Sequence, residues 1–249
     1  MIAYHLVLIA PISAKIYPVG FHSVLIDLSL IISKSVVFVR NMFDDQTEVT
    51  SILTQLFEHS DILTNKLVPE LLQSIQNTPL DRTDALIDRA IAIIHAWDTD
   101  DQSRFIVAHP RIGENKQLSA LSAKEQTGGL SATTRVETPP EVLERLAYLN
   151  ACYEHVYSGL RYITFVNGRS RAAIAREMED KLHLGHPLES YPNGPPLNEP
   201  ALESLSCVAK GSAEWSNELE RAVDDVGRIA KSRQKTVLSS PVGGAAIVA

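Results

Sequence analysis

The sequence predicts an all-α fold, a compact multi-helix bundle, and three observations favour it. Apolar residues recur at the i, i+3, i+4, i+7 spacing of a helix face in successive segments between residues 47 and 236. The run from Tyr162 to Val166 is β-branched enough for a strand, but the chain offers no second run to pair with it. Hydrophobic residues make up 45% of the 249 residues, which is enough for a sizeable core. We therefore expect roughly seven helices.

The first half of the predicted domain is organised so that it leads to a histidine. Helix starts are recognised by a capping residue followed by apolar periodicity. The elements expected in order are a helix at about 47–57, a helix at 62–72, a helix from Thr83 or Asp84 to Trp97, an acidic loop at 98–102, and a short apolar helix or turn at 103–108 that ends at His109.

The second half begins with a strong helix start, the sequence Thr138-Pro-Pro-Glu141. Thr138 is expected to cap the helix, with Pro139 at its first position and Glu141 closing a capping box. This helix should stop at Gly159. The elements expected after it are an extended or irregular segment at 162–166, a helix at 170–182, a proline-rich insert at 186–215, and a last helix at about 216–232.

The predicted domain covers residues 47–236, with an extension at 1–46 and a tail at 237–249. The first 40 residues carry a net charge of +2, so the remaining residues carry −9. Their apolar runs are too short for a transmembrane helix, and no basic residue precedes Lys15 as a secretory signal would require. We interpret this segment as an extension foreign to the domain that packs poorly against it.

Composition excludes several classes of function. The net charge of −7 argues against a nucleic-acid partner, which needs a clustered basic face. Cys152 and Cys207 are too few for a disulfide framework and are interpreted as reduced thiols. The chain has no Cys-x-x-Cys or His-x-x-x-His spacing and no glycine-rich phosphate loop. We expect no metal site and no membrane partner.

The stretch from Ala108 to Leu130 departs from simple helical periodicity and holds the candidate chemistry. His109 precedes Pro110, so its backbone should leave the helix, and an imidazole can give or take a proton near neutral pH. The alternative is a loop histidine satisfied by backbone groups. Ser122 and Glu125 form a capping box, which explains both residues without function. The other interpretation is that Glu125 faces His109 and orients its ring. The spacing of the two residues leaves both interpretations of Glu125 open.

Six short motifs occur in a specific order and spacing, although each alone is weak. They are Leu56-Phe-Glu-His-Ser60, Ala108-His-Pro110, Ser122-x-x-Glu-Gln126, Leu149-Asn-x-x-Tyr153, Leu160 to Phe165, and Gly168-Arg-Ser-Arg171. Together they resemble one enzyme family, the 2-oxo-4-hydroxy-4-carboxy-5-ureidoimidazoline (OHCU) decarboxylases of uric acid degradation. The resemblance covers about residues 47–185 and resumes at Glu218–Arg233.

The resemblance implies an all-α homodimer that converts OHCU to (S)-allantoin without a cofactor. By this resemblance His109 is the general acid/base and Glu125 orients it or binds the substrate's NH groups. The implied substrate-binding residues are Pro110, Ser122, Gln126, Leu160, Arg161, Tyr162, Ile163 and Thr164. Relatives have Phe-Pro-Phe where this chain has Leu160-Arg-Tyr162, so Arg161 is a charge that the family pattern lacks and that could favour the substrate carboxylate.

Two other functions compete with this one. The same scaffold could be a non-catalytic helical interaction domain, or a hydrolase that acts on a related ureide with His109 as the base toward water. Relatives in eukaryotes are often peroxisomal, but this chain ends in Ala-Ile-Val-Ala rather than a Ser-Lys-Leu type signal. Localisation in the peroxisome or the cytoplasm is therefore expected.

Overall fold

The computed structural model describes residues 46–80, 84–114, 138–190 and 199–239. These ranges hold seven α-helices, one π-helical turn and two 3-10 turns, and no strand, so the all-α prediction is confirmed for them. The elements are α2 (Gln46–Phe57), η1 (Leu63–Leu67), α3 (Val68–Asn77), α4 (Asp84–Ala96), α5 (Thr99–Val107), α7 (Pro140–Val156), α8 (Arg171–Lys181), η2 (Pro187–Ser190), η3 (Leu202–Ser204) and α9 (Ala213–Ser239).

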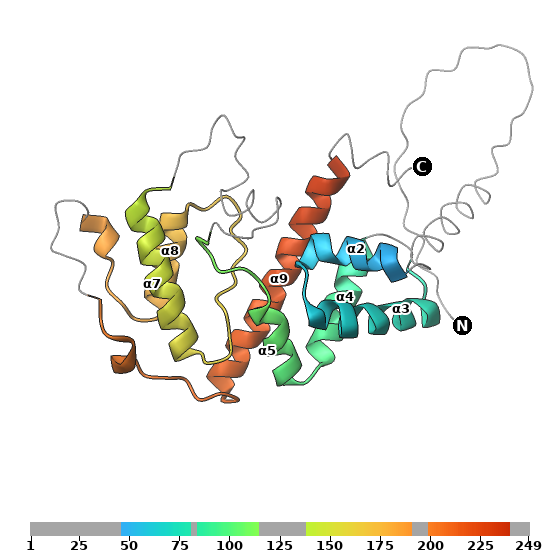
Figure 1. Ribbon diagram of the computed structural model, residues 1–249, viewed down its shortest axis with the longest axis horizontal. Helices are drawn as coiled ribbons and strands as arrows, with labels where there is room; N and C mark the ends of the chain where they lie inside the picture. The colour runs from blue at the N-terminus through green and yellow to red at the C-terminus, as the bar shows by residue number, and fades with distance from the viewer. Residues whose placement is uncertain (1–45, 81–83, 115–137, 191–198, 240–249) are drawn as a thin grey trace, which may run out of the picture.

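The long helix α9 runs through the middle of the described fold, between two groups of helices (Figure 1). It packs against α2, α4 and α5, while α7 and α8 pack against each other on its other side. The largest fully buried side chains come from both groups and from α9 itself: Trp215, Tyr153, Tyr162, Phe57 and Phe105. One continuous apolar core therefore joins the two groups through α9.

The acidic run that was expected to be a loop at 98–102 is the first turn of α5, so that expectation was wrong. Asp98 is the N-cap, and its carboxylate accepts a hydrogen bond from the backbone N–H of Asp101 at 2.9 Å. Carboxylates favour the positive end of a helix dipole, which explains why an acidic run begins this helix. The helix still ends at the predicted place and leads to His109.

The start of α7 differs by one residue from the predicted one. Pro139 occupies the N-cap position and Pro140 is the first helical residue, with no side-chain cap from Thr138. Proline needs no N–H partner in the first helical turn, so two prolines can begin the helix without a capping box. The helix ends at Val156, and Gly159 follows in the left-handed region with φ of +83°. α9 is longer than expected at both ends.

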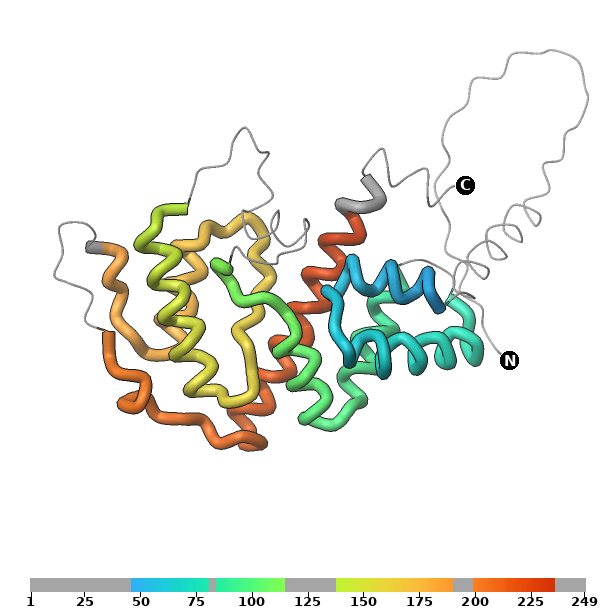
Figure 2. The backbone as a smooth tube through the Cα atoms, in the orientation of Figure 1, coloured from blue at the N-terminus to red at the C-terminus, as the bar shows by residue number. Residues whose placement is uncertain are grey.

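The backbone tube shows two segments without an α-helix beside α7 (Figure 2). Residues 160–166 have no regular secondary structure, as predicted. The second segment, residues 199–212, follows α7 and is attached by hydrogen bonds from Tyr148 Oη to the Pro200 carbonyl at 2.9 Å and from Val208 N–H to the Val156 carbonyl at 2.8 Å. In the described ranges no helix is both long enough and apolar enough to cross a membrane. The predicted extension at 1–46 falls almost entirely outside the described residues.

Candidate active site

His109 lies immediately after α5 and is buried, with 5% of its surface exposed. Its backbone N–H donates to the Ile106 carbonyl at 3.1 Å, and Nδ1 lies 2.9 Å from the Phe105 carbonyl. Because a carbonyl can only accept, Nδ1 carries the proton and Nε2 carries the lone pair. The ring stands edge-on to Phe105 at 5.0 Å between centroids. Among the described residues, Nε2 has no hydrogen-bond partner.

Burial lowers the pKa of His109 to about 4, because the charged imidazolium is poorly solvated there. The Phe105 carbonyl and the Glu58 carboxylate raise this pKa, whereas the Arg233 and Arg161 guanidinium groups lower it further. The imidazole is therefore neutral at neutral pH. Nε2, which has no hydrogen-bond partner among the described residues, is available as a proton acceptor in a buried position.

Arg161 brings the irregular segment 160–164 into direct contact with the histidine. Its Nη1 donates a hydrogen bond to the His109 backbone carbonyl, and its Nε lies 3.6 Å from Glu154 Oε1. The guanidinium is largely buried, and burial lowers the pKa of Arg161. Among the described residues its buried Nε has no hydrogen-bond partner. Arg161 thus places a poorly solvated cation beside the imidazole, where an anion would be attracted.

The rest of this segment is buried and anchored by one side chain from α9 and one from the residues just before α8. Arg221 of α9 donates to the Ile163 carbonyl at 2.8 Å. Arg169, just before α8, donates to Thr164 Oγ1 at 2.9 Å. Within the described part of the chain, the backbone N–H groups of residues 161–164 donate to no backbone carbonyl. Buried N–H groups need an acceptor, so these groups are suited to hold a ligand oxygen.

A buried ion pair that the sequence did not suggest completes this region. Arg233 of α9 lies 2.8 Å from Glu58 Oε1 and donates to the Leu56 carbonyl at 3.2 Å. Glu58 has φ of +68°, an uncommon conformation for a residue with a side chain, and such strain is found preferentially at functional sites. Glu58 lies within a motif that carries the family resemblance, and Arg233 ends the range where the resemblance resumes, which was the signal that could have found them.

The predicted site residues fall into two groups. The structure brings His109, the half-buried Pro110 and the segment 160–164 together through the Arg161 contact. The other predicted residues, Ser122, Glu125 and Gln126, lie outside the described residues, so their pairing with His109 stays a prediction. In the described ranges, no group of three or more His, Cys, Asp or Glu residues is placed to hold a metal ion.

The described residues define an all-α protein in which a buried, neutral imidazole lies near guanidinium groups and near backbone N–H groups that donate to no described backbone carbonyl. The chain belongs to the OHCU decarboxylase family, whose model matches residues 44–190. It is also 24% identical over 144 residues to the uric acid degradation bifunctional protein of Bacillus sp. (strain TB-90). That match covers 57% of this chain and 26% of the relative, so the chain spans about a quarter of the relative's length.

Proposed function

We propose that this protein is a carboxy-lyase that converts OHCU to (S)-allantoin in uric acid degradation, without a cofactor. The observation that carries the proposal is the buried, neutral His109 near the cationic Arg161, with an Nε2 that has no hydrogen-bond partner among the described residues. Membership of the OHCU decarboxylase family supports the substrate. The printed name of the bacterial relative supports the pathway.

The chemistry requires one bond to break and one proton to be delivered. When the carboxylate leaves as CO2, the electron pair of the broken C–C bond stays on the ring and is delocalised into the adjacent imine or carbonyl system. His109, neutral at the start, accepts the proton of the substrate's hydroxyl group at Nε2 and, once CO2 has left, delivers it to a single face of a ring carbon, while the hydroxyl oxygen becomes a ring carbonyl. An imidazolium with a pKa of about 4 gives up its proton readily, which suits protonation of carbon. Because the proton reaches the ring from one face only, a single enantiomer of allantoin forms.

The remaining residues bind and orient the substrate in this proposal. Arg161 attracts the carboxylate, and the N–H groups of residues 161–164 hold a ureido or ring oxygen. Pro110 forms part of the wall. Beyond the described residues, Glu125 orients the imidazole or binds the substrate's NH groups, and Ser122 and Gln126 add polar contacts.

The test follows CO2 release and the chirality of allantoin from freshly generated OHCU. The substrate decays on its own to racemic allantoin, so catalysis appears as faster CO2 release with (S)-allantoin in excess. His109→Asn and Glu125→Ala should each abolish the acceleration while the far-UV circular dichroism stays that of wild type. Wild-type turnover in either variant would remove that residue from the mechanism. No acceleration by the wild-type protein indicates a non-catalytic domain, and consumption without CO2 indicates a ureide hydrolase.

Two properties implied by the family resemblance belong to the same proposal. The protein is proposed to be a homodimer, and light scattering coupled to size-exclusion chromatography should give twice the mass of 27.4 kDa. A monomeric mass at working concentration would contradict this. Its proposed location is the peroxisome or the cytoplasm, which fluorescence microscopy of a tagged chain distinguishes.

A further inference from the structure

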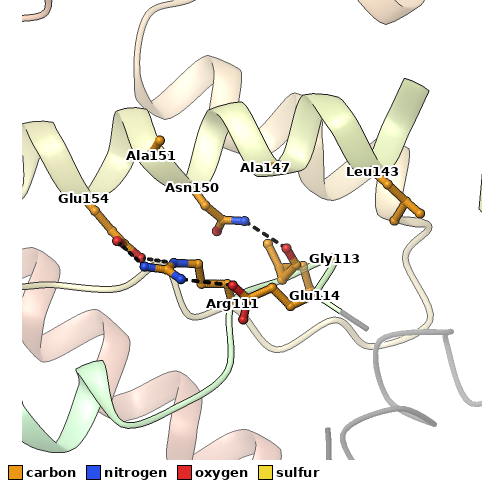
Figure 3. Close-up of a pocket in the computed structure, with 9 residues that line it drawn as sticks. Arg111, Gly113, Glu114, Leu143, Ala147, Asn150, Ala151 and Glu154 are labelled. Carbon is orange, nitrogen blue, oxygen red and sulfur yellow. Dashed lines mark hydrogen bonds and ion pairs between the residues drawn. The ribbon is translucent and has the colours of Figure 1, made fainter. Parts of the chain in front are cut away.

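The turn that follows His109 lies on one face of α7. Asn150 Nδ2 donates to the Ile112 carbonyl at 2.9 Å. One helical turn further on, Glu154 receives Arg111 as a fork, with Nε to Oε1 at 2.6 Å and Nη2 to Oε2 at 2.8 Å (Figure 3). The turn is therefore attached at two successive residues to side chains on the same helix face.

Leu146, one helical turn before Asn150, shows how closely the turn approaches α7. Gly113 has φ of +87°, and a Cβ atom built on it would lie 3.1 Å from Leu146 Cδ1. Such a contact is tighter than ordinary packing allows. Glycine is needed there both for its backbone conformation and for this approach.

Glu154 also lies close to the segment 160–164, on the other side of His109 in the candidate active site. Its Oε1 lies 3.6 Å from Arg161 Nε, and Arg161 donates to the His109 carbonyl. The Glu154 carboxylate thus binds Arg111, two residues after His109. It also faces Arg161, which binds the His109 backbone carbonyl. Glu114 provides a contrast, because it accepts from Arg111 Nη1 at 3.0 Å on the exposed side of the same turn.

We propose that Glu154, assisted by Asn150, is a positioning residue that fixes His109 against the segment 160–164. Its link with turnover rests on the proposed decarboxylase function. Glu154 touches no reacting atom in this proposal. Its side chain is 28% exposed, so the ion pair itself adds little to stability, and its effect is on the geometry of the turn.

The position of His109 can be measured through its pKa. The charged groups that act on the ring are Glu58 beyond α2, Arg233 of α9 and Arg161 of the segment 160–164. Replacing Glu154 by glutamine has two opposite effects. Loss of a negative charge by itself lowers the pKa of His109, whereas release of the turn lets water reach the ring and raises it. The sign of the change therefore distinguishes positioning from charge.

The first experiment follows the imidazole resonances by NMR as a function of pH, with the His109 signal identified by its absence in His109→Asn. The wild-type protein and the control Glu114→Gln should both titrate near the His109 value of about 4. Glu154→Gln should raise this pKa toward 6.5, the ordinary value of histidine. Arg111→Lys, which keeps the charge but loses the fork, should do the same and serves if Glu154→Gln does not fold. An unchanged or lowered pKa in these two variants overturns the proposal.

The second experiment measures turnover of OHCU. Glu154→Gln should lower kcat about ten-fold with KM nearly unchanged, because misplaced catalytic groups slow the chemical step more than they weaken binding. Glu114→Gln should match wild type. If wild type does not release CO2, the proposed function fails, and the titration still decides whether Glu154 positions His109. If the pKa of His109 rises in Glu154→Gln but kcat does not fall, the link with turnover is overturned.

Discussion

At the scale of single residues, the two ring nitrogens of His109 have different surroundings. Nδ1 donates to the Phe105 carbonyl, which is the backbone satisfaction expected of an ordinary loop histidine. Nε2 is buried without a partner among the described residues, which is what an acid/base group requires. The interpretation as a backbone-satisfied histidine accounts for Nδ1, and the acid/base role of Nε2 stays a prediction.

The depressed pKa of His109 predicts a loss of stability at acidic pH. Between pH 6.5 and about 4 the unfolded chain binds a proton at this residue that the folded protein does not, so stability falls as pH decreases through this window. Below pH 4 the loss of unfolding free energy from this residue reaches its full size of about 3 kcal/mol. Urea unfolding at pH 7 and pH 4.5 should show a larger loss for wild type than for His109→Asn.

Comparing the losses of unfolding free energy in wild type and His109→Asn isolates the effect of His109. The same carboxylates titrate in both proteins, so their contributions largely cancel. Equal losses of unfolding free energy in the two proteins would contradict the buried, neutral state of His109. A larger loss in His109→Asn would contradict it as well.

At the residue scale, the sequence predicted the backbone conformation of His109 but not the burial of its ring. Pro110 indicated that the backbone leaves the helix at His109, as the structure shows. No local pattern indicated that the ring would be buried, because burial depends on partners such as Arg233, whose bond to the Leu56 carbonyl spans 177 residues. The position of Glu125 remains a prediction for the same reason, since only long-range packing decides it.

At the scale of elements, apolar periodicity predicted where helices form better than where they begin. The buried positions of α4, Ile87, Ala90 and Ile94, follow the expected spacing. Asp98, by contrast, starts α5 within a polar run that has no apolar period, so this helix start could not be distinguished from a loop. The segment 160–166 was predicted to lack a strand because it had no partner, and side-chain hydrogen bonds take the place of a sheet ladder there.

The packing of the turn against α7 predicts different costs for two glycine substitutions. Gly113 and Gly211 both have positive φ, at +87° and +81°, so alanine costs about 1 kcal/mol at either position for the backbone alone. A Cβ at Gly113 also meets Leu146, whereas a Cβ at Gly211 has nothing within 4 Å. Gly113→Ala should therefore destabilise by roughly 2 kcal/mol or more and Gly211→Ala by about 1 kcal/mol.

The free energies of unfolding of the two variants, measured in urea, test this prediction. Equal losses would show that the turn yields to the added methyl group and does not pack tightly on α7. In that case the α7 face would be a weaker support for His109 than the distances indicate.

At the scale of the whole molecule, the candidate site lies where the two groups of helices meet around α9. His109 follows α5 on one side, the segment 160–164 follows α7 on the other, and Arg233 belongs to α9 (Figure 1). The sequence predicted the fold class and named candidate site residues, whose roles stay predictions, by a family resemblance that covers both groups of helices and α9. It could not predict that α9 joins them, because a single amphipathic stripe does not specify its partners.

Because one core joins both groups through α9, the described fold should unfold as a single cooperative unit. The two tryptophans report on opposite sides of this core. Trp97 packs on Phe105 at 6.1 Å between centroids and donates to Glu70, whereas Trp215 of α9 donates to the Ser158 carbonyl beyond α7.

In Trp97→Phe and Trp215→Phe, the fluorescence of the remaining tryptophan should follow the same urea transition as the far-UV circular dichroism of that variant. Comparing the two signals within each variant removes the stability cost of the substitution itself. A Trp215 transition at lower urea than the loss of helical signal would show that the α7 side separates first, and α9 would then not unite the two groups.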